Sequence, residues 1–317
     1  MIRFIFFCAA LAICSNLFSQ DTTIHGQDTT VIFENQKITL PEVFVHNNMD
    51  YLSILKRIKD DTTFYKAFRT LHIIGYTAYN NIRILNKDGD LKASWNSKTV
   101  QQRDSGCRTM QILEQQTTGD FFDKKGNFNY TTGEMYASIF LTKGKVCGED
   151  NIVAGHTFST EGKSGIEKHK EQLKMLFFNP GKKVPGIPFI GDKLDLYDEH
   201  AHKLYDYQLH FIDYKGSFAY VFSIKPKDDL GLFQRGDIVV DEMTTWFDYK
   251  TLEVLARNYV LSYKAGIYNF NVNMQVEMMK VGNLLVPQTL RYKGNFGVLF
   301  KKKEWGEFTA TLFDFKE

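Results

Sequence analysis

Cysteine is scarce in this sequence, and its scarcity limits the chemistry that the chain can carry. Only four cysteines occur in 317 residues, and two of them, Cys8 and Cys14, stand among the first twenty residues. The other two, Cys107 and Cys147, have no clustered histidine and no second cysteine pair beside them. They therefore do not form a zinc site.

No charge of one sign dominates, and no long hydrophobic run occurs beyond the N-terminus. The net charge is +2 and the pI is about 8.1, so bulk electrostatics point neither to nucleic acid nor to an acidic surface as a partner. No run outside the first twenty residues approaches the ~18 apolar residues of a membrane helix, so we expect no transmembrane span.

The first twenty residues have the pattern of a secretory signal peptide. Arg3 supplies a short positive region, residues 4–13 form an apolar core, and residues 15–20 form a polar exit. We expect cleavage near Ser19 or Gln20 and an exported protein that is periplasmic or associated with the outer membrane. The alternative is a lipoprotein signal, because residues 11–14 resemble a lipobox. In an exported chain, Cys107 and Cys147 either form one disulfide or remain two lone thiols on separate strands.

Aromatic residues make up 15% of the chain, and many of them alternate with polar residues as in β-strands. The clearest alternation covers residues 268–278, where Phe270, Met274 and their neighbours on one side face Asn and Gln on the other. Similar segments joined by short polar turns fill residues 204–292, and a last strand is expected over 308–315. Strands joined by such short turns are antiparallel neighbours.

The first half of the chain mixes helix and strand signals. A polar leader is expected over residues 21–38 and a short strand over 40–46. An apolar stripe that begins with Tyr51 and Ile54 predicts a helix near 50–60, and a capping box at Ser164 and Glu167 predicts another over 164–178. The expected strands are residues 71–85, 91–98, 108–117, 128–142 and 151–158.

The motifs that could carry catalysis are incomplete. Residues 162–164, Gly-Lys-Ser, resemble the end of a phosphate-binding loop, but Thr157 occupies the place of its first glycine and Ser164 is explained as a helix cap. Ile166 likewise stands where a nucleophile elbow needs glycine. We therefore expect no enzyme and no cofactor.

Two further groups are candidate sites. His200 and His202 lie beside Asp198 and Glu199, and on a strand two imidazoles at this spacing could share a metal; a solvated turn is the alternative. Aromatic and methionine side chains on the strands either line an apolar cavity or only pack the core. The cavity candidates are Trp246, Tyr263, Phe270 and Met274. The lysines at 301–303 indicate a solvated turn, or else a contact with a membrane surface.

The order of these elements resembles the lipoprotein-carrier fold of the LolA/LolB type. The motifs that carry the resemblance are Tyr205-Asp206-Tyr207, Tyr220-Val221-Phe222-Ser223-Ile224-Lys225-Pro226, Gly236-Asp237-Ile238-Val239-Val240-Asp241, Trp246-Phe247-Asp248-Tyr249-Lys250-Thr251 and Asn283-Leu284-Leu285-Val286-Pro287. The resemblance implies a mainly β (α+β) fold in which a curved antiparallel half-barrel sheet wraps around a few helices and its concave face can hold acyl chains. Residues 47–317 would form this single domain.

Three functions follow as hypotheses. The first is a non-enzymatic envelope protein that binds an apolar ligand, such as a lipid, an acyl chain or a lipoprotein, in the half-barrel. The second is an envelope module that uses the same sheet to bind a protein partner. The third is a hydrolase with a metal at His200 and His202.

Overall fold

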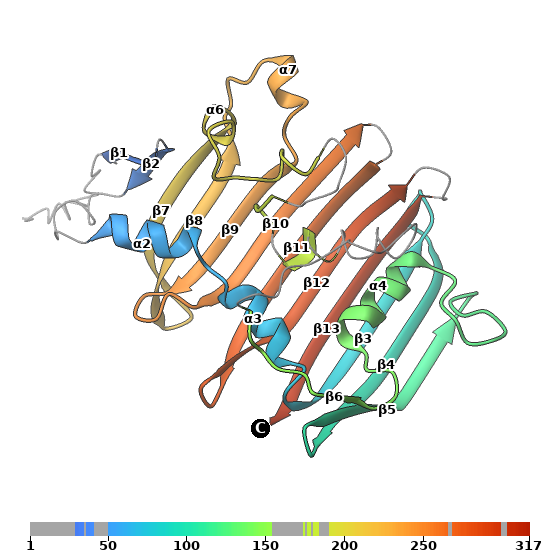
Figure 1. Cartoon of the computed structure of the whole chain (residues 1–317). Helices are drawn as coiled ribbons and strands as arrows, with labels where there is room; N and C mark the ends of the chain where they lie inside the picture. Colours follow the sequence, from blue (N-terminus) through green and yellow to red (C-terminus); the bar gives the residue numbers. More distant parts are fainter. Residues whose placement is uncertain are drawn as a thin grey trace, which may run out of the picture.

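The strands of the computed structural model form a single open sheet with helices on one face (Figure 1). The structure describes residues 29–34, 36–40, 50–153, 174, 176–178, 180–183, 190–265, 268–298 and 303–317. Within them, thirteen strands are ordered β1-β2-β7-β8-β9-β10-β11-β12-β13-β3-β4-β5-β6. Their bounds are β1 (Thr29–Phe33), β2 (Gln36–Leu40), β3 (Gly75–Leu85), β4 (Leu91–Asp104), β5 (Cys107–Thr118), β6 (Val146–Cys147), β7 (Tyr205–Tyr214), β8 (Ser217–Pro226), β9 (Val240–Asp248), β10 (Val254–Ala265), β11 (Tyr268–Val281), β12 (Leu284–Val298) and β13 (Glu304–Lys316).

Strands β7 to β13 form an antiparallel meander in sequence order, which confirms the arrangement predicted from the short turns. In β11 the alternation has the expected sides, because Phe270, Met274 and Val276 are buried while Asn271, Asn273 and Gln275 are exposed. The turn between β7 and β8 places Lys215 and Gly216 at positive φ, a conformation that two-residue hairpin turns require.

The last strand, β13, joins two parts of the sheet. β13 lies between β12 and β3, so Phe308 is paired with Tyr292 on one side and with Ile82 on the other. β3, β4 and β5 then continue the sheet as further antiparallel strands. The sheet therefore consists of a C-terminal meander and an N-terminal block that meet at β13.

In the part of the chain that the structure describes, three helices of more than four residues pack on one face of the sheet: α2 (Tyr51–Lys59), α3 (Thr63–Thr70) and α4 (Thr131–Phe140) (Figure 1). α2 begins where the apolar stripe predicts a helix, and the Asp50 carboxylate accepts a hydrogen bond from the Ser53 amide at 3.1 Å. Phe68 of α3 packs edge-on against Phe177 and Phe178 and contacts Phe140 of α4. The fold is mainly β with helices on one side, which confirms the predicted fold class.

The strand predicted for residues 128–142 is wrong, because α4 occupies most of that range. Gly133, Tyr136 and Phe140 form its buried face at a spacing of three and four residues, the period of a helix. Glycine disfavours a helix, but here it allows close packing, since a Cβ on Gly133 would lie 2.9 Å from Phe128 Cδ1. The sequence pattern gave no sign of this contact.

The structure describes residues 29–34 and 36–38 of the predicted polar leader, and Leu40, the first residue of the short strand predicted over 40–46. β1 and β2 form a hairpin, and Ile38 and Leu40 are buried completely. β2 then pairs in parallel with β7, and the Gln36 side chain donates to the Leu196 carbonyl at 3.2 Å. Burial of two apolar side chains thus orders a segment that reads as polar.

The remaining predicted elements fall partly or wholly outside the described residues. Lys174 and Leu176–Phe178 are helical, and the rest of the helix expected at 164–178 is not described. Residues 151–153 have no regular structure, and 154–158 of the expected strand are not described. The signal peptide and residues 41–46 also lie outside the described residues. Two four-residue helices, α6 (Ala201–Leu204) and α7 (Leu232–Arg235), complete the described elements.

Candidate ligand-binding site

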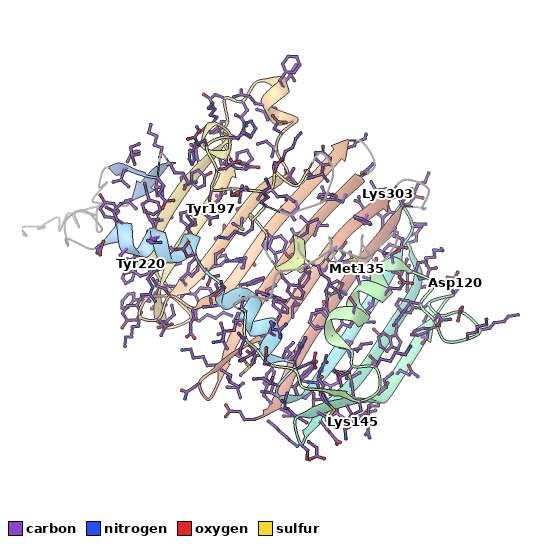
Figure 2. All side chains as sticks on the ribbon, in the orientation of Figure 1. Asp120, Met135, Lys145, Tyr197, Tyr220 and Lys303 are labelled. Carbon is purple, nitrogen blue, oxygen red and sulfur yellow. A yellow bond between two sulfur atoms is a disulfide. The ribbon has the colours of Figure 1, made fainter. Side chains whose placement is uncertain are left out.

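An apolar pocket lies between the middle of the sheet and the helices that cover it. The room that it leaves for the centres of water molecules is about 60 Å³. Met135 of α4 lies over the strands (Figure 2). The pocket is lined by Thr131, Thr132, Met135, Leu176, Phe177, Tyr259, Leu261, Phe270, Val272, Met274, Tyr292, Phe296, Glu304 and Phe308.

The pocket wall contains one carboxylate, that of Glu304, and this carboxylate accepts hydrogen bonds from the first residues of α4. Its two oxygens accept hydrogen bonds from the backbone amides of Thr131 at 2.9 Å and Thr132 at 3.1 Å, and from the Thr132 hydroxyl at 3.2 Å. A carboxylate at this place satisfies amides that a helix leaves unpaired and interacts favourably with the helix dipole. Glu304 is therefore a helix cap and not a free acid or base.

The tyrosines of the wall are also unsuited to acid–base chemistry. The Tyr259 hydroxyl donates to the Phe177 carbonyl at 3.0 Å, and burial raises the pKa of Tyr259 well above its usual value. Burial likewise raises the pKa of Tyr292, whose ring stacks on Phe308 with 4.8 Å between centroids. The wall thus offers mainly apolar surface, and most of its polar atoms already have protein partners.

The structure brings together two of the four residues predicted to line a cavity. Phe270 and Met274 line the pocket, as their place on the buried side of β11 predicts. Trp246 does not, because alternation along β9 turns Phe247 inward and Trp246 to the opposite face, where it packs against Tyr214. Tyr263 lies beyond the pocket, with its ring 6.2 Å from that of Phe270.

Sequence reasoning missed the part of the wall that α4 supplies. Thr131, Thr132 and Met135 fall in the range predicted as a strand, and Glu304 begins the last strand. A Tyr-Thr-Thr-Gly-Glu sequence before an apolar run could have suggested a helix start, since threonine and an acidic residue favour the first turn.

The hypothesis of a two-histidine metal site required a strand, and the structure places a helix there. His200 immediately precedes α6 and His202 lies within it, so a two-residue separation turns their side chains to different sides of the helix. His200 Nε2 lies 3.5 Å from the Asp237 carboxylate, and burial lowers the pKa of His202. Within the described ranges, no three potential metal ligands cluster together.

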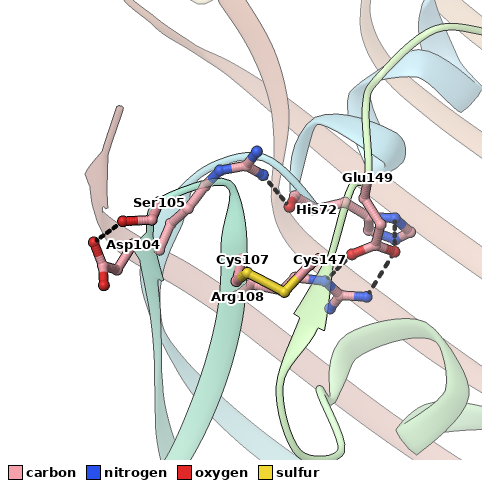
Figure 3. The surroundings of a disulfide bond; sticks show 8 residues. His72, Asp104, Ser105, Cys107, Arg108, Cys147 and Glu149 are labelled. Carbon is pink, nitrogen blue, oxygen red and sulfur yellow. Dashed lines mark hydrogen bonds and ion pairs between the residues drawn. A yellow bond between two sulfur atoms is a disulfide. The ribbon is translucent and has the colours of Figure 1, made fainter.

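Cys107 and Cys147 form a disulfide between β5 and β6 (Figure 3). Beside it, the Arg108 guanidinium donates to both oxygens of Glu149, at 2.5 and 3.1 Å. His72 Nδ1 lies 3.0 Å from the same carboxylate. Burial, together with the charges of Arg108 and Arg69, nevertheless lowers the pKa of His72 to about 4. The positive charges of Arg108 and Arg69 already balance the negative charge of Glu149. Together with the disulfide, these contacts attach residues 146–150 to the sheet.

Several solved structures are similar to this chain at low sequence identity and low TM-score. No protein-family model and no curated protein sequence matches it. A DUF1329 family protein from Desulfovibrio piger is 9% identical, with a TM-score of 0.25 over 80% of this chain and 91% of that one. A domain named for outer-membrane lipoprotein sorting, from Vibrio parahaemolyticus, is 10% identical, with a TM-score of 0.27 over 80% of this chain and 90% of that one.

A LolA superfamily protein from Nitrosomonas europaea is 9% identical, with a TM-score of 0.23 over 80% of this chain and 91% of that one. These matches assign no ligand to this chain. Among the described helices, none has the length and apolarity needed to cross a membrane.

Proposed function

We propose that this protein is a non-enzymatic protein of the cell envelope that binds an apolar chain, from a lipid or a lipoprotein, in the pocket between sheet and helices. The observation that carries the proposal is the wall of the pocket, where aromatic, leucine, valine and methionine side chains predominate. Sites for small apolar ligands have this composition, with a few polar groups that fix orientation.

The polar groups in the wall favour the proposal of an apolar ligand, because they already have hydrogen-bond partners within the protein. The Glu304 carboxylate accepts hydrogen bonds from the backbone amides at the start of α4, and the Tyr259 hydroxyl donates a hydrogen bond to the Phe177 carbonyl. A polar ligand would lose its hydrogen bonds to water without gaining equivalent ones here, and this loss costs roughly 1–3 kcal/mol for each unpaired group. An acyl chain incurs no such loss, and its burial is favourable by about 0.8 kcal/mol per CH₂.

Mass spectrometry of lipids released from the gently purified protein tests the proposal directly. A fluorescent fatty-acid analogue then measures binding, and Val272→Trp is the informative variant because Val272 is half-buried in the pocket wall. We expect the larger side chain to reduce affinity at least about tenfold, which is about 1.4 kcal/mol.

Ile212→Trp is the matched control, since Ile212 lies on β7 away from the pocket and is 40% exposed. It should bind the analogue as the unaltered protein does. Absence of co-purified lipid together with absence of saturable binding of the analogue would reject the proposal.

A protein-docking role is the second candidate, favoured by the tip of α7. Leu232 is 89% exposed and Phe233 is 96% exposed, although large apolar side chains are usually buried. A photo-crosslinker in place of Phe233 should capture one specific envelope protein in cells if this role is correct. Crosslinked products that do not differ from those of a crosslinker at exposed Lys250 would count against it.

A further inference from the structure

A cleft lined by polar and cationic side chains lies on the face of the sheet opposite the apolar pocket. Along β11, Phe270 is buried on the pocket side, so its neighbours Asn269 and Asn271 point to the other face. The strand register places Lys264 of β10 beside Asn269, and Asn295 of β12 beside Asn271. The cleft leaves about 500 Å³ for the centres of water molecules. This volume falls within the range of roughly 300–1,000 Å³ that small-molecule sites have.

Lys303 reaches into this cleft across β12. It immediately precedes β13, at one end of the strands (Figure 2). Its side chain passes over Gly297, where an added Cβ would lie 3.4 Å from Lys303 Cγ. Its Nζ donates to the Asn269 side-chain oxygen at 2.9 Å. Since Asn269 is paired with Lys264 on one side and with Gly297 on the other, two ammonium groups share this end of the cleft.

Three cations line the cleft without an acidic partner. Among the described residues, Arg235, Lys264 and Lys303 form no ion pair. Arg235 donates from Nε to the Leu230 carbonyl and from Nη2 to the Asp228 carbonyl, which leaves Nη1. The ammonium of Lys303 carries three donor hydrogens and uses one of them on Asn269. Charged donors therefore remain available to an anion.

Two acidic side chains beside the cleft leave most of this charge in place. Asp237 is paired with Lys193 at 2.8 Å. Asp241 interacts with the Ser262 side chain in the cleft wall. Three cations and the single charge of Asp241 leave a net charge of +2 at the cleft. A phosphate monoester carries about −1.5 to −2 at pH 7, so one such group balances it.

The amides of the cleft wall add a requirement for a hydrogen-bond donor. Asn295 Oδ1 is buried and has no hydrogen-bond partner among the described residues. A buried acceptor without a donor is unfavourable, and a phosphate dianion has no hydrogen to give it. A hydroxyl group on the same ligand can donate to this oxygen. Asn271 stands beside Asn295 in the same wall and offers a second amide.

We propose that the cleft binds a phosphate monoester of a sugar or another polyol, with the cations on the phosphate and the amides on the hydroxyl groups. Charge-assisted hydrogen bonds from lysine and arginine suit the phosphate oxygens. The site is separate from the apolar pocket, because its side chains lie on the other face of the sheet. The inference therefore goes beyond the proposed function and does not depend on it.

Calorimetric titration of the purified protein tests the two parts of the proposal. The probes are glucose 6-phosphate, inorganic phosphate and glucose, each at low ionic strength. We expect glucose 6-phosphate to bind at least about tenfold more tightly than inorganic phosphate, and glucose to show no measurable binding. The affinity for glucose 6-phosphate should fall as added salt screens the charges.

The cations are tested by combining Lys264→Gln with Lys303→Gln. This double variant should bind glucose 6-phosphate at least about tenfold more weakly than the unaltered protein. Lys250→Gln is the matched control, because Lys250 is exposed in the turn after β9, at the opposite end of the strands. It should retain the affinity of the unaltered protein.

The amide is tested with Asn295→Leu, which keeps the shape of the side chain and removes its polar atoms. We expect the preference for glucose 6-phosphate over inorganic phosphate to fall below about threefold, and the affinity for inorganic phosphate to stay unchanged. Thermal denaturation of each variant, followed by circular dichroism, confirms that the sheet is intact.

A vesicle experiment distinguishes a free ligand from a lipid headgroup of the same chemistry. Phosphatidylcholine vesicles with and without phosphatidylinositol 4-phosphate are sedimented with the protein. Binding of glucose 6-phosphate in solution supports a free ligand, and binding only to the phosphorylated vesicles supports a headgroup. Binding of neither would overturn the proposal. Equal affinity for glucose 6-phosphate and inorganic phosphate would also overturn it, because the hydroxyl groups would then contribute nothing.

Discussion

Glu304 shows how a single side chain sets the position of a helix. Its carboxylate comes from the first residue of β13 and caps α4, which is more than 160 residues earlier in the chain. Because the amides of Thr131 and Thr132 depend on it, the cap also holds Met135 over the pocket.

We predict that Glu304→Ala lowers the free energy of unfolding by about 1–2 kcal/mol, because helix amides lose their acceptor and the helix dipole loses a favourable charge. Urea denaturation measures this change. Glu242→Ala is the control: Glu242 forms an exposed pair with Lys225, and its loss should change stability by less than about 0.5 kcal/mol. Equal effects of the two substitutions would contradict the role of Glu304 as a cap.

His72 predicts how stability depends on pH. Its pKa in the folded protein is about 4, below the ordinary value of 6.5, so the folded state prefers the neutral imidazole. At a pH between these two pKa values, His72 binds a proton in the unfolded chain but not in the folded chain. The stability that His72 contributes is therefore present above pH 6.5 and is lost as the pH falls towards 4.

Over that interval we expect acidification to cost on the order of 1–3 kcal/mol through this group. His72→Gln should flatten the dependence of unfolding free energy on pH between 6.5 and 4, measured by denaturant titrations at matched ionic strength. A variant with the same pH profile as the unaltered protein would show that His72 does not cause the effect.

At the scale of elements, the disulfide fixes the segment that follows α4. Cys107 and Cys147 are 40 residues apart, and β6 pairs with only the first two residues of β5. Two backbone pairs alone would hold this segment weakly. The disulfide, the contact between Arg108 and Glu149 and the hydrogen bonds from Arg69 to Asp150 add to its attachment.

We predict that Cys147→Ser lowers the free energy of unfolding by about 2–4 kcal/mol, since the crosslink restricts a loop of this size in the unfolded chain. Adding a thiol reductant to the unaltered protein should produce a loss of similar size. The reductant should leave the variant unchanged. If the purified protein instead releases two free thiols on denaturation without reductant, the crosslink is absent.

The sequence predicted elements well where local pattern decides them and poorly where distant contacts do. Alternation placed the strands of the meander, and an apolar stripe with an aspartate cap placed α2. α4 was missed although Thr131, Thr132 and Glu134 favour a helix start, because its cap, Glu304, and the residue that packs on Gly133 are contacts outside the helix itself. The burial of Ile38 within a polar sequence was missed because it too depends on tertiary contacts.

The candidate site was predicted in part. Phe270 and Met274 followed from alternation in one strand, which fixes the side of the sheet. Trp246 was a candidate because it is aromatic, and in the structure it lies on the face of the sheet opposite to Phe247.

At the scale of the molecule, the sheet depends on its last strand. β13 separates β12 from β3, and Arg83 of β3 forms an ion pair with Glu307 of β13. Without β13 the meander and the N-terminal block would share no backbone pairs, and both would expose long unpaired edges.

We predict that deletion of residues 304–317 abolishes cooperative unfolding and promotes aggregation, whereas deletion of residues 316–317 has little effect. Circular dichroism during thermal denaturation and size-exclusion chromatography measure the two properties. A single sharp transition in the longer deletion, at the temperature of the full chain, would show that the two parts of the sheet are stable without β13.

The place of β13 also sets the order in which the chain can fold while it is made. Arg83 and Glu307 are 224 residues apart, so β3 leaves the ribosome long before its partner strand exists. Throughout that time the edge of β3 has no neighbour on one side, and the two halves of the sheet cannot join. Folding of the whole sheet is therefore delayed until synthesis is nearly complete. During such a delay the unpaired edges of both halves are open to wrong strand pairing.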